Sequence, residues 1–281
     1  MERIKDYKKL KDECINWIRN WFEENGKGCN AVIGISGGKD STIVAKLCVE
    51  ALGADRVIGV SLPGEGQNNE DAIEVAETLG IELRTIHLGD LLKETMGVAW
   101  FEPTPNAELN LPARFRMMML YYIAQSLNGR VVGTCNASEN YIGYFTKWGD
   151  GASDCEPIGN LTVHEVKRLG YELQVPRHLV DKTPDDGLPN SKPDEEKFGF
   201  SYDMIDRYIC GDFENVPEWI QKKIEKMHEG SLFKTNVTKM IDNFMPEEIF
   251  EFEYGSLDSY QEFMDNIDNS FDNWMVENPP F

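Results

Sequence analysis

The chain has 281 residues, of which 41% are hydrophobic and 27% charged, the proportions of an ordinary globular protein. Its formal charge of −21 argues against nucleic-acid binding, and no apolar run approaches the ~18 residues needed to cross a bilayer. The start of the chain lacks the apolar stretch of a signal peptide, and the six cysteines form no C-x-x-C pair. We therefore expect a cytoplasmic protein with reduced thiols and without a membrane or nucleic-acid partner.

Apolar segments of helical and of strand character alternate along the first half of the chain. The predicted elements are helix 4–24, strand 31–35, helix 42–52, strand 56–62, helix 69–79, strand 81–88, a helix around 108–127 and strand 130–134. This alternation predicts an α/β fold, a parallel sheet with helices on both faces. Loops 36–41, 62–68 and 134–139 each follow a strand, so they are expected to meet at the edge where such sheets bind ligands.

The second half of the chain contains a long loop and an acidic extension. Residues 182–199 are rich in Pro, Gly and charges, which is typical of a functional lid. Residues 241–281 hold eleven acids, nine aromatic residues and no Lys or Arg. Apolar residues at helical spacing between Tyr260 and Met275 predict a helix docked on the rest of the chain or on a second copy, and a helix held out for another partner is the alternative. We expect a domain over 1–239 and an extension over 240–281.

A glycine-rich loop lies between strand 31–35 and helix 42–52, with the sequence Gly34-Ile35-Ser36-Gly37-Gly38-Lys39-Asp40-Ser41. Small residues let several N–H groups converge on one anion, and the following helix adds the positive end of its dipole. The hydroxyls of Ser36 and Ser41 add donors, whereas Asp40 would repel phosphate unless Mg²⁺ lay between them. The loop is not of the Walker type, because Asp40 stands where Ser or Thr must follow the lysine. A glycine-rich turn without a ligand is the alternative.

The run Ser36-Gly37-Gly38-Lys39-Asp40-Ser41 resembles the SGGxDS loop of the N-type ATP pyrophosphatases. Members of that superfamily adenylate a carboxylate or carbonyl oxygen with ATP, hold the departing pyrophosphate in this loop and then admit a nucleophile. The resemblance implies an adenine nucleotide alpha hydrolase-like, doubly wound fold. The loop alone does not distinguish NAD⁺ synthetases from GMP, argininosuccinate or asparagine synthetases, or from tRNA-thiolating enzymes.

Two further segments, 133–139 and 143–154, resemble the G-T-x-x-A-x-E and G-x-x-T-K-x-G-D-G-x-x-D motifs of NAD⁺ synthetases. With Leu111–Arg114 and Gly199–Asp206, the resemblance covers roughly residues 5–238. It implies an ammonia-dependent ligase that uses ATP to amidate deamido-NAD⁺ through an NAD-adenylate. It also implies a homodimer that binds deamido-NAD⁺ near the subunit boundary.

The resemblance implies a role for each matching residue. Mg²⁺ would be bound by Asp40 and Glu139. ATP and deamido-NAD⁺ would be bound by Ser36, Gly37, Gly38, Lys39, Ser41, Gln67, Arg114, Thr134, Lys147, Asp154 and Lys234. Asp40, Lys147 and Asp154 would act in catalysis.

Four positions depart from the family pattern. Val163 stands where members often carry a lysine that contacts ATP phosphates, and Lys167 and Lys182 are the candidates to replace it. The other three departures are Asp185 for Ser or Thr, Phe233 for His, and Ser61 for Arg.

Two other functions remain open on the sequence. Another adenylating pyrophosphatase, such as a tRNA-thiolating enzyme, would favour a basic face or cysteine pairs, which this chain lacks. A non-catalytic nucleotide sensor would explain the departures but would not need two metal ligands. The sheet begins near residue 31, which leaves no room for an amidase domain before it, so free ammonia is the expected nitrogen donor.

Overall fold

The computed structural model describes residues 3–98, 100–182 and 193–235. The chain divides into two compact units, Met1–Thr235 and Asn236–Phe281, and all the described residues belong to the first. Most of the expected lid and the whole acidic extension lie outside the described residues. The docked helix of the extension and the boundary at 239/240 therefore stay predictions.

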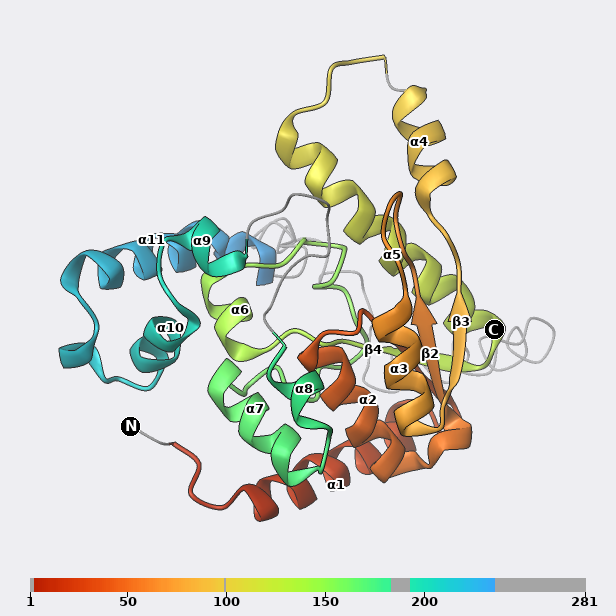
Figure 1. Cartoon of the computed structure of the whole chain (residues 1–281), viewed down its shortest axis with the longest axis horizontal. Helices are drawn as coiled ribbons and strands as arrows, with labels where there is room; N and C mark the ends of the chain where they lie inside the picture. Colours follow the sequence, from red (N-terminus) through yellow and green to blue (C-terminus); the bar gives the residue numbers. More distant parts are fainter. Residues whose placement is uncertain (1–2, 99, 183–192, 236–281) are drawn as a thin grey trace, which may run out of the picture. The chain divides into compact units, whose positions relative to one another are not determined.

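A four-stranded parallel sheet forms the centre of the fold, as predicted (Figure 1). Its strands are β1 (Asn30–Gly34), β2 (Val57–Ser61), β3 (Glu82–Thr85) and β4 (Gly129–Val132), in the order β3-β2-β1-β4. The chain runs outward from β1 to β3 and then returns to place β4 on the other side of β1. Open parallel sheets bind their ligands at such a reversal, outside the carboxyl ends of the two strands, which here are β1 and β4.

Two hydrophobic clusters cover the two faces of the sheet, because successive strand side chains point to opposite sides. Ala31 and Ile33 of β1 belong to the first cluster, and Val32 belongs to the second. The helices that supply the first cluster are α1 (Tyr7–Asn25), α2 (Lys39–Leu52), α3 (Glu70–Leu79), α7 (Val163–Glu172) and α8 (Arg177–Val180). Those of the second are α4 (Gly89–Gly97) and α5 (Pro105–Ser126). The expected arrangement, helices on both faces of a parallel sheet, is confirmed.

A third hydrophobic cluster lies beside the sheet and joins α6 to the last described helices (Figure 1). These are α6 (Ala137–Ile142), α9 (Asp194–Phe198), α10 (Tyr202–Ile209) and α11 (Glu218–Thr235); two short 3₁₀ turns are η1 (Ala54–Arg56) and η2 (Phe213–Asn215). Helix α9 falls within 182–199, so the expectation of an irregular loop throughout that segment is wrong. The Tyr144 hydroxyl donates to Asp194 Oδ1 at 2.8 Å, and Phe198 packs in the third cluster, which stabilises this short helix.

Helix α6 ends at Gly143, which adopts a left-handed conformation with φ of 68°. A Cβ atom added there would lie 2.0 Å from the Cβ of Ser231 on α11. Only glycine satisfies both the backbone conformation and this contact. The close approach sets the position of α11 against the end of α6.

Gly143→Ala should destabilise the protein by more than the ~1–2 kcal/mol typical of a left-handed non-glycine residue, because the clash with Ser231 adds to the backbone strain. Gly80→Ala is the matched control: Gly80 has φ of 65° at the end of α3, and an added Cβ meets nothing within 4 Å. Urea unfolding of both variants measures the difference. Equal losses in the free energy of unfolding would contradict the packing argument.

Candidate active site

The candidate site lies where the loops after β1 and β4 meet. Because the two strands pair in parallel, residues 36–41 and 134–139 leave the same edge of the sheet. The side-chain amide of Asn136 donates to Asp40 Oδ1 at 3.4 Å, which joins the two loops directly. The structure thus brings together the predicted phosphate loop and the turn that carries Glu139.

The phosphate loop turns sharply at Gly37, whose φ is 78°. A Cβ added to Gly37 would lie 2.2 Å from the Cβ of Asp71 at the start of α3, so the loop packs tightly against that helix. Gly38 is the N-cap of α2, and no side chain caps this helix end. The Ser36 hydroxyl accepts from the Gly38 N–H at 3.2 Å and lies 3.1 Å from the Ser41 hydroxyl. The first turn of α2 can therefore direct backbone N–H groups at an anion.

Glu139 is held in place by a capping box at the start of α6. Its Oε2 accepts from the Asn136 N–H at 3.1 Å, while the Asn136 side chain accepts from the N–H groups of Ser138 and Glu139. Burial is the largest effect on this carboxyl, followed by the negative charge of Asp40, and together they raise the pKa of Glu139 to about 8. The positive charge of Lys39 opposes that shift. A cation beside the two carboxylates would relieve their repulsion.

Lys39, the lysine of the phosphate loop, points inward and is only 3% exposed. Its Nζ donates to Asp40 Oδ2 at 2.6 Å. Burial lowers the pKa of Lys39, but the nearby carboxylates of Asp40 and Glu139 outweigh this effect and raise it overall. The ammonium is therefore paired with the carboxylates of the site in this structure.

The donor set of Asp40 and Glu139 fits Mg²⁺. Over the described parts of the chain, no group of three or more His, Cys, Asp or Glu side chains is arranged to hold a metal ion. Mg²⁺ usually needs only one or two protein carboxylates, because waters and substrate phosphates supply the other ligands. Two hard carboxylates beside a phosphate loop match that pattern.

The sequence predicted no roles for Asp206 or Asn136, yet both residues order this site. Asp206 on α10 accepts from the Ser138 hydroxyl at 2.5 Å and from the His164 N–H at 2.8 Å. The Ser138 hydroxyl in turn accepts from the Val163 N–H at 3.1 Å. This buried network ties α6 to α7 and α10. The run Ser201-Tyr202-Asp203-x-x-Asp206 was the only sequence signal for it, because the contacts join residues far apart in the chain.

Arg114 and Lys147 form a second group with the end of α11. Arg114 Nε donates to the Lys147 carbonyl at 3.2 Å, and Lys147 Nζ donates to the Phe233 carbonyl at 2.6 Å. Lys234 instead donates to the carbonyls of Gly143 and Phe145, at 2.7 and 2.8 Å. Burial lowers the pKa of Lys234, and Asp150 opposes this effect. Lys234 thus stabilises the end of α6 in this structure.

Asp154 and Gln67 accept hydrogen bonds from backbone N–H groups at the ends of the strands, and Thr134 lies nearby. Asp154 Oδ2 accepts from the Val131 N–H at 2.7 Å, and its Oδ1 accepts from the Tyr121 hydroxyl at 3.1 Å. Gln67 Oε1 accepts from the Gly64 N–H at 2.7 Å and from Arg116 at 3.0 Å. Thr134 is half-buried just after β4. Contacts of these residues with a ligand stay predictions.

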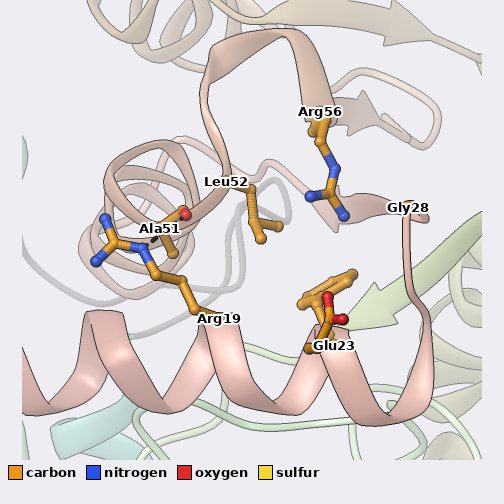
Figure 2. Close-up of a pocket in the computed structure, with 7 residues that line it drawn as sticks. Arg19, Glu23, Gly28, Ala51, Leu52 and Arg56 are labelled. Atoms are coloured by element: carbon orange, nitrogen blue, oxygen red, sulfur yellow. Dashed lines mark hydrogen bonds between the residues drawn. The ribbon is translucent and has the colours of Figure 1, made fainter.

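A separate pocket lies at the opposite end of α2 (Figure 2). Arg19 donates to the carbonyls of Ala51 and Glu50, at 3.0 and 2.8 Å, and so caps the carboxyl end of that helix. Arg56 donates to the Cys29 carbonyl. Arg19 binds the end of α2 that lies far from the phosphate loop, and Arg56 binds the carbonyl just before β1, so this pocket is not part of the candidate site.

Comparison with protein families gives a match to the NAD synthase family over residues 10–262. The NH₃-dependent NAD⁺ synthetase of Archaeoglobus fulgidus is 42% identical over 211 residues, which are 73% of this chain and 83% of that protein. The NH₃-dependent NAD⁺ synthetase of Methanocaldococcus jannaschii is 42% identical over 208 residues, which are 70% of this chain and 80% of that protein.

Solved structures show the same fold. An NMN synthetase from Francisella tularensis superposes with a TM-score of 0.78 and 33% identity, covering 85% of this chain and 100% of that one. An NH₃-dependent NAD synthetase from Campylobacter jejuni, in complex with nitrate, superposes with a TM-score of 0.71 and 25% identity, again over 85% and 100%.

The raised pKa of Glu139 predicts how the stability of the metal-free protein depends on pH. The folded chain binds this proton more tightly than the unfolded chain, where the pKa is near 4.5. The contribution of Glu139 is therefore fully present below about 4.5 and is lost as the pH rises through about 8. The melting temperature in EDTA should fall between about pH 5 and 8, and Glu139→Gln should flatten that fall.

Glu165→Gln is the control for this measurement. Burial raises the pKa of Glu165, but hydrogen bonds from Arg3 and Thr162 outweigh this effect and lower it overall. Glu165 therefore contributes no slope in the neutral range, and its variant should keep the slope of the wild type. A Glu139→Gln variant whose melting temperature falls as steeply as the wild type would show that Glu139 is already ionised.

Proposed function

The chain belongs to the NAD synthase family, and we propose that it catalyses the ATP-dependent amidation of deamido-NAD⁺ to NAD⁺ with ammonia. One observation carries the proposal: the phosphate loop, with Asp40 and the uncapped start of α2, lies beside Glu139 at the carboxyl ends of β1 and β4. That arrangement suits a nucleotide triphosphate whose pyrophosphate is the leaving group.

The reaction has two steps. In the first, the nicotinate carboxylate of deamido-NAD⁺ attacks the α-phosphorus of ATP, so that an NAD-adenylate forms and pyrophosphate leaves. In the second, ammonia attacks the activated carbonyl carbon and displaces AMP, and the amine loses a proton to give the amide. The enzyme is therefore a ligase of NAD biosynthesis that uses ATP as a substrate.

The chain's own residues hold the leaving group. The N–H groups in the first turn of α2 and the hydroxyls of Ser36 and Ser41 donate to the pyrophosphate oxygens, where negative charge develops. Asp40 and Glu139 would hold Mg²⁺, which would supply positive charge against that leaving group. Lys39 limits the repulsion between the two carboxylates before substrates bind.

The second group of residues suits the deamido-NAD⁺ substrate. Arg114 and Lys147 lie together and carry the positive charges that an anionic dinucleotide needs. Asp154 orders the edge of β4 and is exposed, so it can also accept from a sugar hydroxyl or from the incoming amine. Thr134 follows β4 and Gln67 follows β2, and both are assigned to binding the nucleotide. Lys234, near the end of α11, is also assigned to substrate binding.

A homodimer that forms through the outer face of α5 completes the proposal. Arg114, Met118 and Tyr122 follow one another at intervals of four residues and form one stripe of that helix, and the last two are 53% and 67% exposed. A patch of this kind is typical of an interaction site, and its continuity with Arg114 supports a substrate site near the subunit boundary.

None of the described helices is long and apolar enough to cross a bilayer. A cytoplasmic location stays a prediction.

A second candidate substrate is nicotinate mononucleotide. The NMN synthetase structure resembles this chain more closely, by both TM-score and identity, than the Campylobacter NAD synthetase structure does. The two acid substrates carry the same nicotinate carboxylate and differ only in the AMP half, so the same adenylation chemistry serves both.

An assay with ATP, Mg²⁺ and ammonia tests both substrates. We expect deamido-NAD⁺ to give the higher kcat/KM, with one AMP and one pyrophosphate for each NAD⁺ formed. A higher kcat/KM with nicotinate mononucleotide would establish the second candidate instead. Amidation of neither acid would contradict the proposed function.

Asp40→Ala should keep the fold but reduce turnover by about 10²-fold or more, because the charge on pyrophosphate loses its counter-ion site. Asp55→Ala is the control, since Asp55 is exposed in η1 and lies outside the candidate site. Circular dichroism and steady-state rates measure both variants. Near-normal turnover of Asp40→Ala would remove Asp40 from the metal site.

The double variant Met118→Glu/Tyr122→Glu should sediment as a monomer, because like charges would face each other across the α5 contact. Trp219→Glu serves as the control, since it places one acid on an exposed tryptophan of α11. Sedimentation velocity of both variants and the wild type makes the comparison. A double variant that remains a dimer would locate the interface elsewhere.

A further inference from the structure

Lys182 forms an ion pair with Asp71 that brings a cation to the phosphate loop. Lys182 follows α8, whereas Asp71 lies in the first turn of α3, 111 residues away along the chain. The Cβ of Asp71 lies against Gly37, where an added Cβ would come within 2.2 Å of it. The ammonium of Lys182 is therefore separated from the turn of the loop by a single carboxylate side chain.

The loop needs a cation of this kind. A triphosphate bound there would face the carboxylates of Asp40, Asp71 and Glu139, all of which lie in or against the loop. The lysine of the loop, Lys39, is almost fully buried and paired with Asp40. Mg²⁺ bound at Asp40 and Glu139 would not offset the charge of Asp71, whose ion-pair partner is Lys182. Like charges this close repel the substrate unless a positive side chain lies between them.

Lys182 is free to change partners in a way that Lys39 is not. Its side chain is 33% exposed and that of Asp71 is 50% exposed. A partly exposed ion pair is weak, because water stabilises both charges when they separate. A long, flexible lysine side chain can then move from a carboxylate to a phosphate oxygen at little cost.

We propose that Lys182 contacts the β- or γ-phosphate of ATP, and that Asp71 holds its ammonium beside the phosphate loop until ATP binds. This inference rests on the proposed function only in taking ATP as the nucleotide. Val163, at the position where the family pattern has a lysine, is apolar and buried in the third hydrophobic cluster, so it cannot contact a phosphate. Lys182 would supply that contact instead.

The test is direct binding of ATP with Mg²⁺ to the full chain, by isothermal titration calorimetry, with AMP as the second ligand. Lys182→Ala should weaken ATP binding by about tenfold or more, the usual effect of losing a charge-assisted hydrogen bond. It should leave AMP binding unchanged, because AMP has no β- or γ-phosphate. Lys182→Arg should restore most of the ATP affinity.

Two further variants distinguish a phosphate contact of Lys182 from an ion pair that only stabilises the fold. Asp71→Asn should bind ATP as tightly as the wild type or more tightly, because the lysine loses its competing partner and the phosphates lose a repulsive charge. Lys167→Ala, which changes the other lysine suggested by the sequence, should bind ATP as the wild type does.

Three results would each overturn the proposal. They are unchanged ATP affinity in Lys182→Ala, a loss in Asp71→Asn as large as that in Lys182→Ala, and an equal loss for AMP and ATP. If Lys182→Ala does not fold, Lys182→Arg and Asp71→Asn decide the question by the same criteria. A wild type that binds ATP in this pattern but amidates no substrate would refute the proposed function alone, whereas a wild type that does not bind ATP would refute both.

Discussion

Repulsion between two carboxylates, Asp40 and Glu139, is the constraint on which the rest of the site depends. The sheet order places them together, because β1 and β4 are neighbours and each carboxylate follows one of these strands. Burial and this repulsion raise the pKa of Glu139 to about 8, so the ligand-free site is electrostatically unfavourable. The positive charge of Lys39 offsets part of this repulsion. A cation and a triphosphate would complete a site that the protein alone leaves with unbalanced charge.

The helices beside the sheet hold this unfavourable arrangement in place. Asp206 on α10 fixes Ser138, the neighbour of Glu139, through a buried hydrogen bond. The close contact between Gly143 and Ser231 seats α11 against the other end of α6. The short helix that carries Glu139 is thus restrained at both ends by distant segments. Such restraint lets a group with a raised pKa remain in a catalytic position.

The sequence predicted the sheet and its loops well, because buried strands and glycine-rich turns are local signals. It did not predict α4 or α6–α11 as elements, since these helices take their stability from packing in clusters formed by distant residues. A phosphate-binding role for residues 36–41 could be proposed from the sequence, because the motif is contiguous. The contacts of Asn136 with Asp40 and of Asp71 with Lys182 could not be predicted, because each joins segments that lie far apart in the chain. Family resemblance named Asp154 and Lys234 as ligand-binding residues, but not their hydrogen bonds to backbone groups.

Exchange of labelled pyrophosphate into ATP measures the central claim most directly, since it reports the adenylation step before any ammonia is needed. The full chain, incubated with ATP, Mg²⁺ and labelled pyrophosphate but no ammonia, should form labelled ATP only when the nicotinate substrate is present. Added ammonia should then divert the adenylate to the amide and reduce the exchange. Exchange that is absent, or that proceeds equally well without the nicotinate substrate, would contradict an adenylated intermediate.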